Sequence, residues 1–453
     1  MAVHDVNNSA ETVDRLFHLY QSGDLSDIEL RVGNRRFQTH RLVLCMASDV
    51  LKTMLMSKFW PEGRSNRVVL REDPECVAVF EHFLQYLYTG KVVLNQFVVL
   101  PLLILADKYN VSHLSKSCLK YMCAHCCQDT IHHVISWLHY AIICGHKQLE
   151  DICNVFITNN FDNIIDIEEF LSISKEGLLK FLSCSDIVVS SEYKLYLAMK
   201  KWIYNAATEG ELEKPLFHAL VKHIRFPMMQ LQSLLKLEAD PLMSKHKTIS
   251  LRHMFVCMKY HTGSKIDFPP KFLQALEMQK QFVPRIYPTE IWSTEIYVEN
   301  VSTLFEGQVR GAFFSTPITH SDKDEFTHHD WNVMFYPKGV RYEPCLMIGV
   351  PQNLMNPGGM FKSVRLAFCT NCLKETRFKI TVLVLGPSKD NKDYICKAIS
   401  KYALFDSNCT RFNLEHVIPF EEIYKLNSPY KVHKDTLHLK IVIRPIYPVF
   451  GKK

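Results

Sequence analysis

The hydrophobic pattern of this chain changes once, near residue 288, and that change limits the folds open to it. From residue 111 to about residue 237, apolar residues recur at intervals of three and four with few glycines or prolines, which is typical of a helical array. From residue 291, short β-branched or aromatic runs alternate with polar residues and are separated by turn residues. This spacing predicts an antiparallel β-sandwich, so we expect a multidomain α+β protein.

Five runs are the clearest strand candidates in the C-terminal part: residues 331–336, 345–350, 364–369, 378–385 and 437–444. Turn residues separate several of them, as in Pro337-Lys338-Gly339. Short strands with such separators are expected to build two packed sheets.

The N-terminal 125 residues mix the two periodicities and predict an α/β domain. Helices are expected at residues 11–22, 41–56, 74–88 and 96–107, and strands at 27–32, 35–39 and 68–70. Gly33-Asn34 is a hairpin turn signal between the first two strands.

We therefore divide the chain into five segments. Residues 1–10 are expected to be disordered, 11–125 to form the α/β domain, 126–258 the helical domain, 259–288 a linker with one short helix, and 289–453 the sandwich. A length of 453 residues agrees with about three domains.

Composition excludes several classes of partner. The net charge of +6 comes from basic residues interleaved with acidic ones, so no nucleic-acid partner is expected. There is no run of eighteen apolar residues and no apolar leader in residues 1–10, so we expect neither a membrane partner nor secretion. Many of the fifteen cysteines, such as Cys45, Cys118 and Cys153, lie in apolar helical patterns. They predict reduced thiols in a cytoplasmic protein, with the nucleus as a second location.

Three groups of residues have the chemistry of metal ligands, but each favours a simpler interpretation. The first group has a superficially suitable Cys-x-x-Cys and His-His spacing, but its run is predicted to be helical and no second cysteine pair follows, so thiols at a helix junction explain it better. The second lies at a strand end and fits no common zinc module, and the third is better explained as a polar histidine-rich loop. The groups are Cys123, Cys126, Cys127, His132 and His133; Cys369, Cys372, Cys396 and Cys409; and His320, His328, His329 and Asp330. No nucleophile elbow, phosphate loop or His-Glu-x-x-His motif is present, so no metal, cofactor or enzymatic activity is expected.

Each part of the chain carries a set of short motifs. The first 125 residues contain Leu25–Ile28, Phe37-x-x-His40-Arg41-x-Val43-Leu44, Ser48, Asn66–Leu70, Tyr86–Gly90 and Ala106–Tyr109, and with these they resemble a BTB (POZ) domain. Residues 130–240 contain Leu182–Val189, Ser191-Glu192, Ala198-x-x-x-Trp202-Ile203 and Ile224–Met229, and they resemble a BACK domain. The last 160 residues contain Trp331–Pro337-x-Gly339 and residues 420–444, and they resemble a TRAF-like (MATH-type) sandwich.

The BTB resemblance implies a docking site for cullin-3 in the loop Phe59-Trp60-Pro61-Glu62, where related domains carry a hydrophobic-x-Glu motif. An exposed aromatic side chain can enter a partner pocket while a carboxylate orients it. The expected docking residues are Met56, Phe59, Trp60, Glu62 and Tyr88. The alternative is a loop whose aromatic side chains fold back on their own domain.

The same resemblance implies a homodimer. Related domains bury an acid and a base at the positions of Asp27 and Arg41, and a helix near residues 13–20 packs across the dimer. Leu16, Phe17 and Tyr20 are the expected contacts on that helix. The alternative for Asp27 and Arg41 is a surface ion pair that contributes almost nothing to stability.

Together, these expectations describe a substrate-recruiting adaptor of a cullin-3 RING ubiquitin ligase. Its partners are cullin-3, a second copy of the chain and a protein substrate of unknown identity held by the sandwich. Two other classes stay open: a BTB scaffold that assembles complexes without a cullin, and a secreted glycan- or matrix-binding protein.

Overall fold

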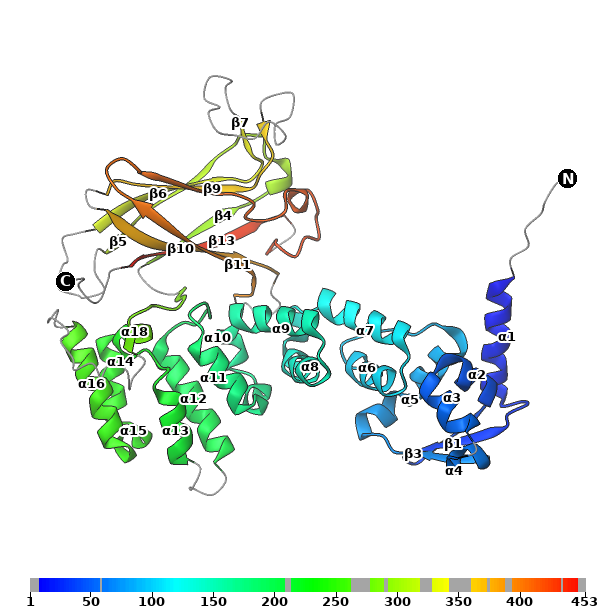
Figure 1. Ribbon diagram of the computed structural model, residues 1–453. Helices are drawn as coiled ribbons and strands as arrows, with labels where there is room; N and C mark the ends of the chain where they lie inside the picture. The colour runs from blue at the N-terminus through cyan, green and yellow to red at the C-terminus, as the bar shows by residue number, and fades with distance from the viewer. Residues whose placement is uncertain are drawn as a thin grey trace. The chain divides into compact units, whose positions relative to one another are not determined.

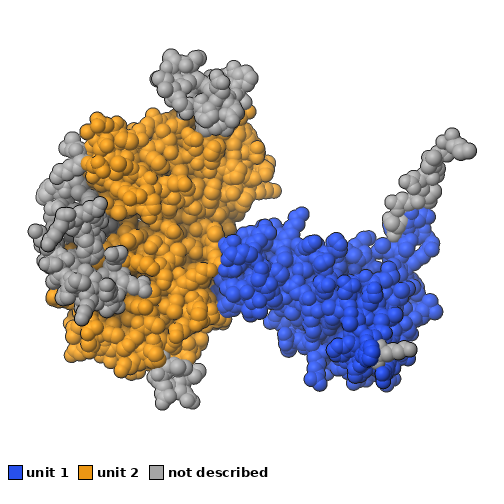
Figure 2. All heavy atoms as spheres, viewed as in Figure 1, with its two compact units in different colours: residues 1–153 blue, residues 154–453 orange. Residues whose placement is uncertain are grey.

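The computed structural model describes residues 8–57, 59–207, 213–261, 278–288, 292–317, 328–341, 360–372, 375–387, 393–432 and 435–446. It contains two compact units, unit 1 (residues 1–153) and unit 2 (residues 154–453), and the division falls inside helix α9 (Figure 2). The expected strand at 345–350 lies outside the described residues.

Unit 1 is built on a three-stranded sheet with the order β2-β1-β3. The strands are β1 (Ile28–Val32), β2 (Arg35–Thr39) and β3 (Arg67–Leu70). β1 pairs antiparallel with β2 and parallel with β3, and Gly33 takes a φ of +57° in the turn between β1 and β2. The hairpin predicted from Gly33-Asn34 is confirmed, because glycine adopts this left-handed conformation without steric strain.

The rest of unit 1 is helical, and α2 to α5 lie nearest the sheet (Figure 1). They are α1 (Ser9–Ser22), α2 (Arg41–Ala47), α3 (Asp49–Met56), α4 (Pro61–Arg64), α5 (Pro74–Thr89), α6 (Val99–Lys108), α7 (Ser112–Ala124), the 3-10 turn η1 (Gln128–Thr130), α8 (Ile131–Cys144) and α9 (Lys147–Asn159). Helix α1 begins at Ser9, so the expectation of disorder through residue 10 is wrong at Ser9 and Ala10.

Ser48 divides the single helix expected at residues 41–56 into two. Its backbone is extended, and its hydroxyl accepts a hydrogen bond from the amide of Leu51 at 3.0 Å, which caps α3. The same hydroxyl donates to the carbonyl of Tyr109. Serine at this position satisfies a free amide of the new helix, so the chain can turn without losing a buried hydrogen bond.

Unit 2 begins with a helical array (Figure 1). After α9 come α10 (Phe161–Ile164), η2 (Glu168–Ser172), α11 (Lys175–Ser183), α12 (Glu192–Ala206), α13 (Glu213–Val221), η3 (Phe226–Met228), α14 (Leu231–Glu238), α15 (Pro241–Lys245), α16 (Lys247–His261) and α18 (Met278–Gln281). The buried Trp202 indole donates to the carbonyl of Ile173 at 2.9 Å and joins α12 to the η2 region. None of the described helices is both long and apolar enough to cross a membrane.

The C-terminal half of unit 2 is the predicted antiparallel sandwich. Its strands are β4 (Ser293–Val298), β5 (Arg310–Pro317), β6 (His328–Tyr336), β7 (Val340–Arg341), β8 (Met360–Phe361), β9 (Arg365–Thr370), β10 (Thr376–Leu385), β11 (Ile395–Phe405), β12 (Arg411–Leu414) and β13 (Leu437–Ile446), with turns η4 (Val301–Thr303) and η7 (Phe420–Ile423). The two main sheets have the orders β11-β10-β13-β4 and β12-β9-β6-β5.

The core lies between these two sheets. Trp331 of β6 is 1% exposed and meets Phe378 and Phe405 edge-to-face, at ring distances of 4.9 and 5.3 Å. Its indole nitrogen donates to Thr316 Oγ1 at 2.9 Å, so the polar atom of this large side chain is satisfied inside the core.

The sheet containing β10 and β13 is buried on its other face as well. Leu383, Leu385, Ile395 and Val442 form a second apolar cluster with Val188 of the helical array and with Ile286 and Trp292. Cations lie on the same face of these strands: Lys379 pairs with Asp186 at 2.9 Å and Lys440 with Glu295 at 2.8 Å. The guanidinium of Arg444 lies 4.4 Å from the ring centre of Tyr287.

The segment Phe282–Pro288, the described end of the expected linker, packs between the helical array and the sandwich within unit 2. We call it the strap. Two backbone hydrogen bonds join Ile286 to the array. The Ile286 amide donates to the Ile187 carbonyl at 3.3 Å, and the Val189 amide donates to the Ile286 carbonyl at 3.1 Å. Residues 285–287 are at most 2% exposed, so this part of the chain is core and not a spacer.

A buried ionic network, formed by Glu192, Arg225, Arg285 and Tyr287, holds the strap in place. Glu192 accepts hydrogen bonds from Arg285 Nε and from the Tyr287 hydroxyl, both at 2.6 Å, and from the Arg225 amide at 3.0 Å. Arg285 also donates to the carbonyls of Leu182, Cys184 and His223. Both Glu192 and Arg285 have fully buried side chains, so each charge depends on the other.

We expect Arg285→Ala to destabilise unit 2 by about 3–5 kcal/mol, because it leaves the Glu192 carboxylate buried without its cation. Amide hydrogen exchange at Ile286 and Val189 should accelerate, since these amides join the strap to the array. Arg411→Ala, at an exposed position of the same unit, is the control and should leave exchange unchanged. Equal protection in both variants would show that the network does not hold the strap.

His253 of α16 makes the stability of unit 2 depend on pH. It is 2% exposed and stacks on Phe226 at 4.6 Å, and burial lowers its pKa from 6.5 to about 4. As the pH falls through 6.5, His253 is therefore protonated in the unfolded chain but stays neutral in the folded unit. The free energy of unfolding is not reduced by this group above pH 6.5, and it should be lower by about 2 kcal/mol at pH 5. Urea unfolding at pH 7.5 and pH 5 tests this: His253→Phe should reduce the difference, and an undiminished difference would assign it to other groups.

Candidate functional site

Six exposed apolar side chains of unit 1 come from α2, α3 and the loop that follows. Phe59 is 97% exposed, Met56 65% and Trp60 53%. Leu42, Met46 and Val50 of the preceding helices are also exposed. A folded chain rarely exposes this much apolar surface unless the surface binds a partner.

A groove of about 460 Å³ lies in this region, and we call it the α3 groove. Trp60 and Glu62 line it, as the docking prediction requires. The other lining residues, Asp49, Val50, Thr53 and Met54, belong to α3. An apolar lining that includes the carboxylates of Asp49 and Glu62 suits an apolar anchor accompanied by hydrogen-bond donors or positive charge.

Glu62 has an oxygen that is ready to accept a hydrogen bond. Its Oε2 is buried and has no hydrogen-bond partner among the described residues. A buried polar atom left in this state costs about 1–3 kcal/mol, a cost that a donor from a bound partner would remove. This oxygen makes the α3 groove a stronger docking candidate than the exposed aromatics do alone.

The loop is held in its bend by Ser57 and Gly63. The Trp60 amide donates to the Ser57 carbonyl at 3.3 Å, and the Gly63 amide donates to the Trp60 carbonyl at 3.1 Å. A Cβ at position 63 would lie only 2.1 Å from the Ser57 carbonyl oxygen. Glycine is therefore required for the close approach that places Trp60 and Glu62 in the groove.

Tyr88, the fifth expected docking residue, lies outside the groove. It is 4% exposed, and its hydroxyl accepts a hydrogen bond from the His40 amide at 2.9 Å. Its ring packs against Tyr20 of α1 at 4.9 Å. Burial raises the pKa of Tyr88 to about 12, so its hydroxyl stays protonated. Tyr88 stabilises the position of α1 and of the β2–α2 junction.

The expected dimer residues are placed on the protomer as follows. Leu16, Phe17 and Tyr20 are half-buried on α1, and α1 packs on α5. Asp27 and Arg41 are linked differently from the expected side-chain ion pair. The Asp27 carboxylate is exposed and accepts from the Arg41 backbone amide at 2.8 Å, while the Arg41 guanidinium donates to the carbonyls of Leu55 and Ser65. Arg41 therefore joins α2 to the chain on both sides of the loop Phe59-Trp60-Pro61-Glu62, which we call the docking loop.

Cys126 and Cys372, two of the cysteines considered for zinc, have raised thiol pKa values. A hydrogen bond with Cys153, together with burial, raises the pKa of Cys126 well above its ordinary value. In the sandwich, Cys372 Sγ lies 3.4 Å from His329 Nδ1, but burial raises the pKa of Cys372 and lowers that of His329. Protonated thiols are poor ligands and poor nucleophiles. His320 lies outside the described residues.

Family models match the three parts of the chain. The BTB/POZ domain matches residues 16–126, BACK (BTB And C-terminal Kelch) matches residues 134–238, and the BTBD17 TRAF domain matches residues 282–447. The chain is therefore a BTB–BACK protein with a C-terminal BTBD17-type TRAF domain, which confirms the fold class and the domain order expected from the motifs.

This chain is homologous to BTB/POZ domain-containing protein 17 across 98% of its length. Identity is 26% to the Xenopus tropicalis protein and 26% to the Homo sapiens protein, and the alignments cover 92% and 90% of those proteins. Galectin-3-binding protein of Rattus norvegicus is 28% identical over 64% of this chain and 50% of that protein. Among solved structures, the BTB domain of zebrafish PATZ1 covers 27% of this chain and 97% of that chain, at 22% identity and a TM-score of 0.23.

We expect Gly63→Ala to displace the docking loop, because the added methyl group cannot fit against the Ser57 carbonyl. Hydrogen exchange of the Trp60 amide should accelerate, while exchange in the β1–β2 hairpin stays slow. Gly311→Ala is the matched control, since its Cβ would meet its nearest neighbour at an ordinary 3.7 Å. An unchanged exchange rate at Trp60 would mean that the close approach does not fix the loop.

Proposed function

We propose that this chain recruits substrates to a cullin-3 RING ubiquitin ligase. The observation that carries the proposal is the α3 groove, where Trp60 is exposed and a buried Glu62 oxygen has no hydrogen-bond partner among the described residues. The BTB and BACK domains support a role in dimerisation and in binding protein partners. Cullin-3 is the partner that the Phe59-Trp60-Pro61-Glu62 motif indicates.

In this proposal the chain supplies binding and placement but no chemistry. Ubiquitin transfer occurs on the RING subunit and its partner enzyme, so the adaptor needs no nucleophile of its own. The raised pKa values of Cys76, Cys118 and Cys257 agree with this role, because burial keeps their thiols protonated. A BTB homodimer would present two docking sites and two sandwiches, which raises avidity for a repetitive substrate.

The sandwich is the proposed substrate-binding part. The strap and the buried ionic network fix it to the BACK helices within unit 2, so a bound substrate would move with the array and not on a loose tether. The free thiols at the described cysteines support a reducing compartment. We accordingly propose the cytoplasm, with the nucleus as a second location.

Affinity capture of cullin-3 by the full chain tests the docking function. Wild type should retain cullin-3, and Trp60→Ala should weaken binding by about thirtyfold or more, as expected when an aromatic anchor is removed from an interface centre. Glu62→Ala should weaken binding less than Trp60→Ala, because it also removes the unsatisfied oxygen from the free protein.

Phe313→Ala is the control, since this aromatic side chain is 79% exposed on the sandwich. It should bind cullin-3 as wild type does. Equal retention by wild type and the two groove variants would place the interface elsewhere. A folded dimer that does not bind cullin-3 at all would instead favour a BTB scaffold without ligase function.

A further inference from the structure

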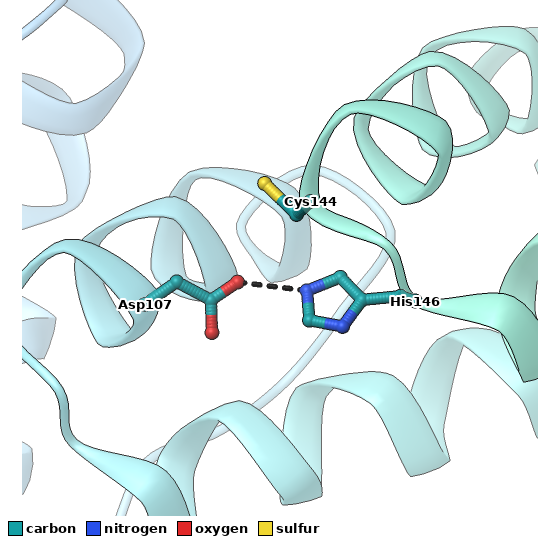
Figure 3. Close-up of side chains that lie close together, drawn as sticks. All are labelled: Asp107, Cys144 and His146. Carbon is teal, nitrogen blue, oxygen red and sulfur yellow. Dashed lines mark hydrogen bonds and ion pairs between the residues drawn. The ribbon is translucent and has the colours of Figure 1, made fainter.

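Three side chains with metal-binding chemistry meet in unit 1 at the ends of two helices. Asp107 lies in the last turn of α6, Cys144 is the last residue of α8, and His146 follows Gly145 (Figure 3). Gly145 takes a φ of +74°, which turns the chain so that Cys144 and His146 both approach Asp107. The carboxylate, thiol and imidazole ligand atoms all lie within 4.8 Å of one another.

The Asp107 carboxylate is already held in one orientation. Ser115 Oγ donates to Oδ1 at 2.7 Å, and the Tyr140 hydroxyl donates to Oδ2 at 2.9 Å. His146 Nε2 lies 2.9 Å from the same Oδ2, as the dashed line in Figure 3 shows. The Tyr140 hydroxyl also hydrogen-bonds to Cys144, so this phenol contacts two of the three ligand groups. Such outer contacts orient the ligands of protein-bound metals and raise their affinity.

The backbone charge near these side chains is mixed. The C-terminal ends of α6 and α8 carry partial negative charge and add to that of the Asp107 carboxylate, whereas α9 begins at Lys147, directly after His146, and its N-terminus carries partial positive charge. Two lysines adjoin the ligands in sequence, and both have other acidic partners. Lys108, next to Asp107, donates to Glu72 and to the Arg71 carbonyl, each at 2.8 Å, and Lys147, next to His146, pairs with Glu150 at 3.2 Å. The Asp107 and His146 side chains are 24% and 20% exposed, and Cys144 is exposed, so an ion could reach them from solvent.

We propose that Asp107, Cys144 and His146 bind a zinc ion, with a water molecule as the fourth ligand. Carboxylate, thiolate and imidazole are all zinc ligands, and three protein ligands plus water form a common tetrahedral site. On binding, the Cys144 thiol gives its proton to solvent and its sulfur coordinates the ion, while the His146 Nε2 proton that faces Asp107 passes through solvent to Nδ1 and leaves Nε2 free to coordinate. The His146–Asp107 separation opens from the hydrogen-bonded 2.9 Å to about 3.3 Å, the spacing of two ligands each about 2.0 Å from one tetrahedral ion.

The alternative is a plain hydrogen bond from His146 to Asp107 that joins the α8–α9 turn to α6. In that case Cys144 has no role, and an added metal finds no sulfur ligand. The two interpretations therefore differ at the thiol, which is exposed and can be replaced without disturbing the core.

Cobalt(II) titration of the reduced, metal-free full chain distinguishes them, because a thiolate bound to cobalt gives an intense near-ultraviolet absorption band. Wild type should show this band together with the visible bands of tetrahedral cobalt, and zinc should displace both. Cys144→Ser should lose the near-ultraviolet band. Cys409→Ser, which removes an exposed thiol of unit 2, should keep it.

Tyr140→Phe should keep the band but weaken zinc binding by about tenfold, since it removes the hydroxyl that donates to Asp107 Oδ2 and orients this carboxylate. Circular dichroism checks that each variant is folded. A wild-type spectrum without the thiolate band overturns the proposal. The same band in Cys144→Ser overturns it as well, because the sulfur would then come from another cysteine.

Discussion

The ion pair between Glu192 and Arg285 is the interaction on which unit 2 depends. Two buried charges lose their hydration, and only close hydrogen bonding on all sides makes such a pair tolerable. Glu192 meets this demand with a guanidinium, a phenol and a backbone amide, and Arg285 with the carbonyls of the array. Because few backbone arrangements satisfy both groups, the pair specifies how the strap crosses the array.

The second arginine of the network adds a positive charge that no second carboxylate balances among the described residues. Burial and the neighbouring Arg285 lower the pKa of Arg225 to about 10, which still leaves it protonated at neutral pH. Its guanidinium donates to the Val283 carbonyl and the Ser185 hydroxyl. Backbone and hydroxyl dipoles therefore stabilise the excess charge, and they come from the strap and from the loop before α12. The Arg225 guanidinium therefore links the strap to the loop before α12.

Two glutamates, Glu192 and Glu62, show how differently the same side chain is satisfied in the two units. Glu192 is saturated with hydrogen bonds and inaccessible, whereas Glu62 keeps a buried oxygen without a partner among the described residues. The sequence predicts the role of Glu62 from a local motif beside Trp60. It does not predict that of Glu192, because its partner lies 93 residues away. The sequence also does not predict that α3 lines the groove, because residues such as Val50 follow an ordinary helical pattern.

Hydrophobic periodicity predicts helices and strands well where one face is buried and the other is exposed to solvent, as in the β1–β2 hairpin and α5. It is ambiguous where both faces are covered. Alternation of apolar residues with Lys379, Lys440 and Arg444 is typical of a half-exposed sheet, yet these cations are at most 9% exposed. Long aliphatic stems let such side chains cover apolar surface while their charged ends reach an acid or an aromatic ring. Those partners, Asp186 and Tyr287 among them, lie on the helical array and the strap. A cationic strand face can therefore be recognised as an internal interface only when its distant partners are known.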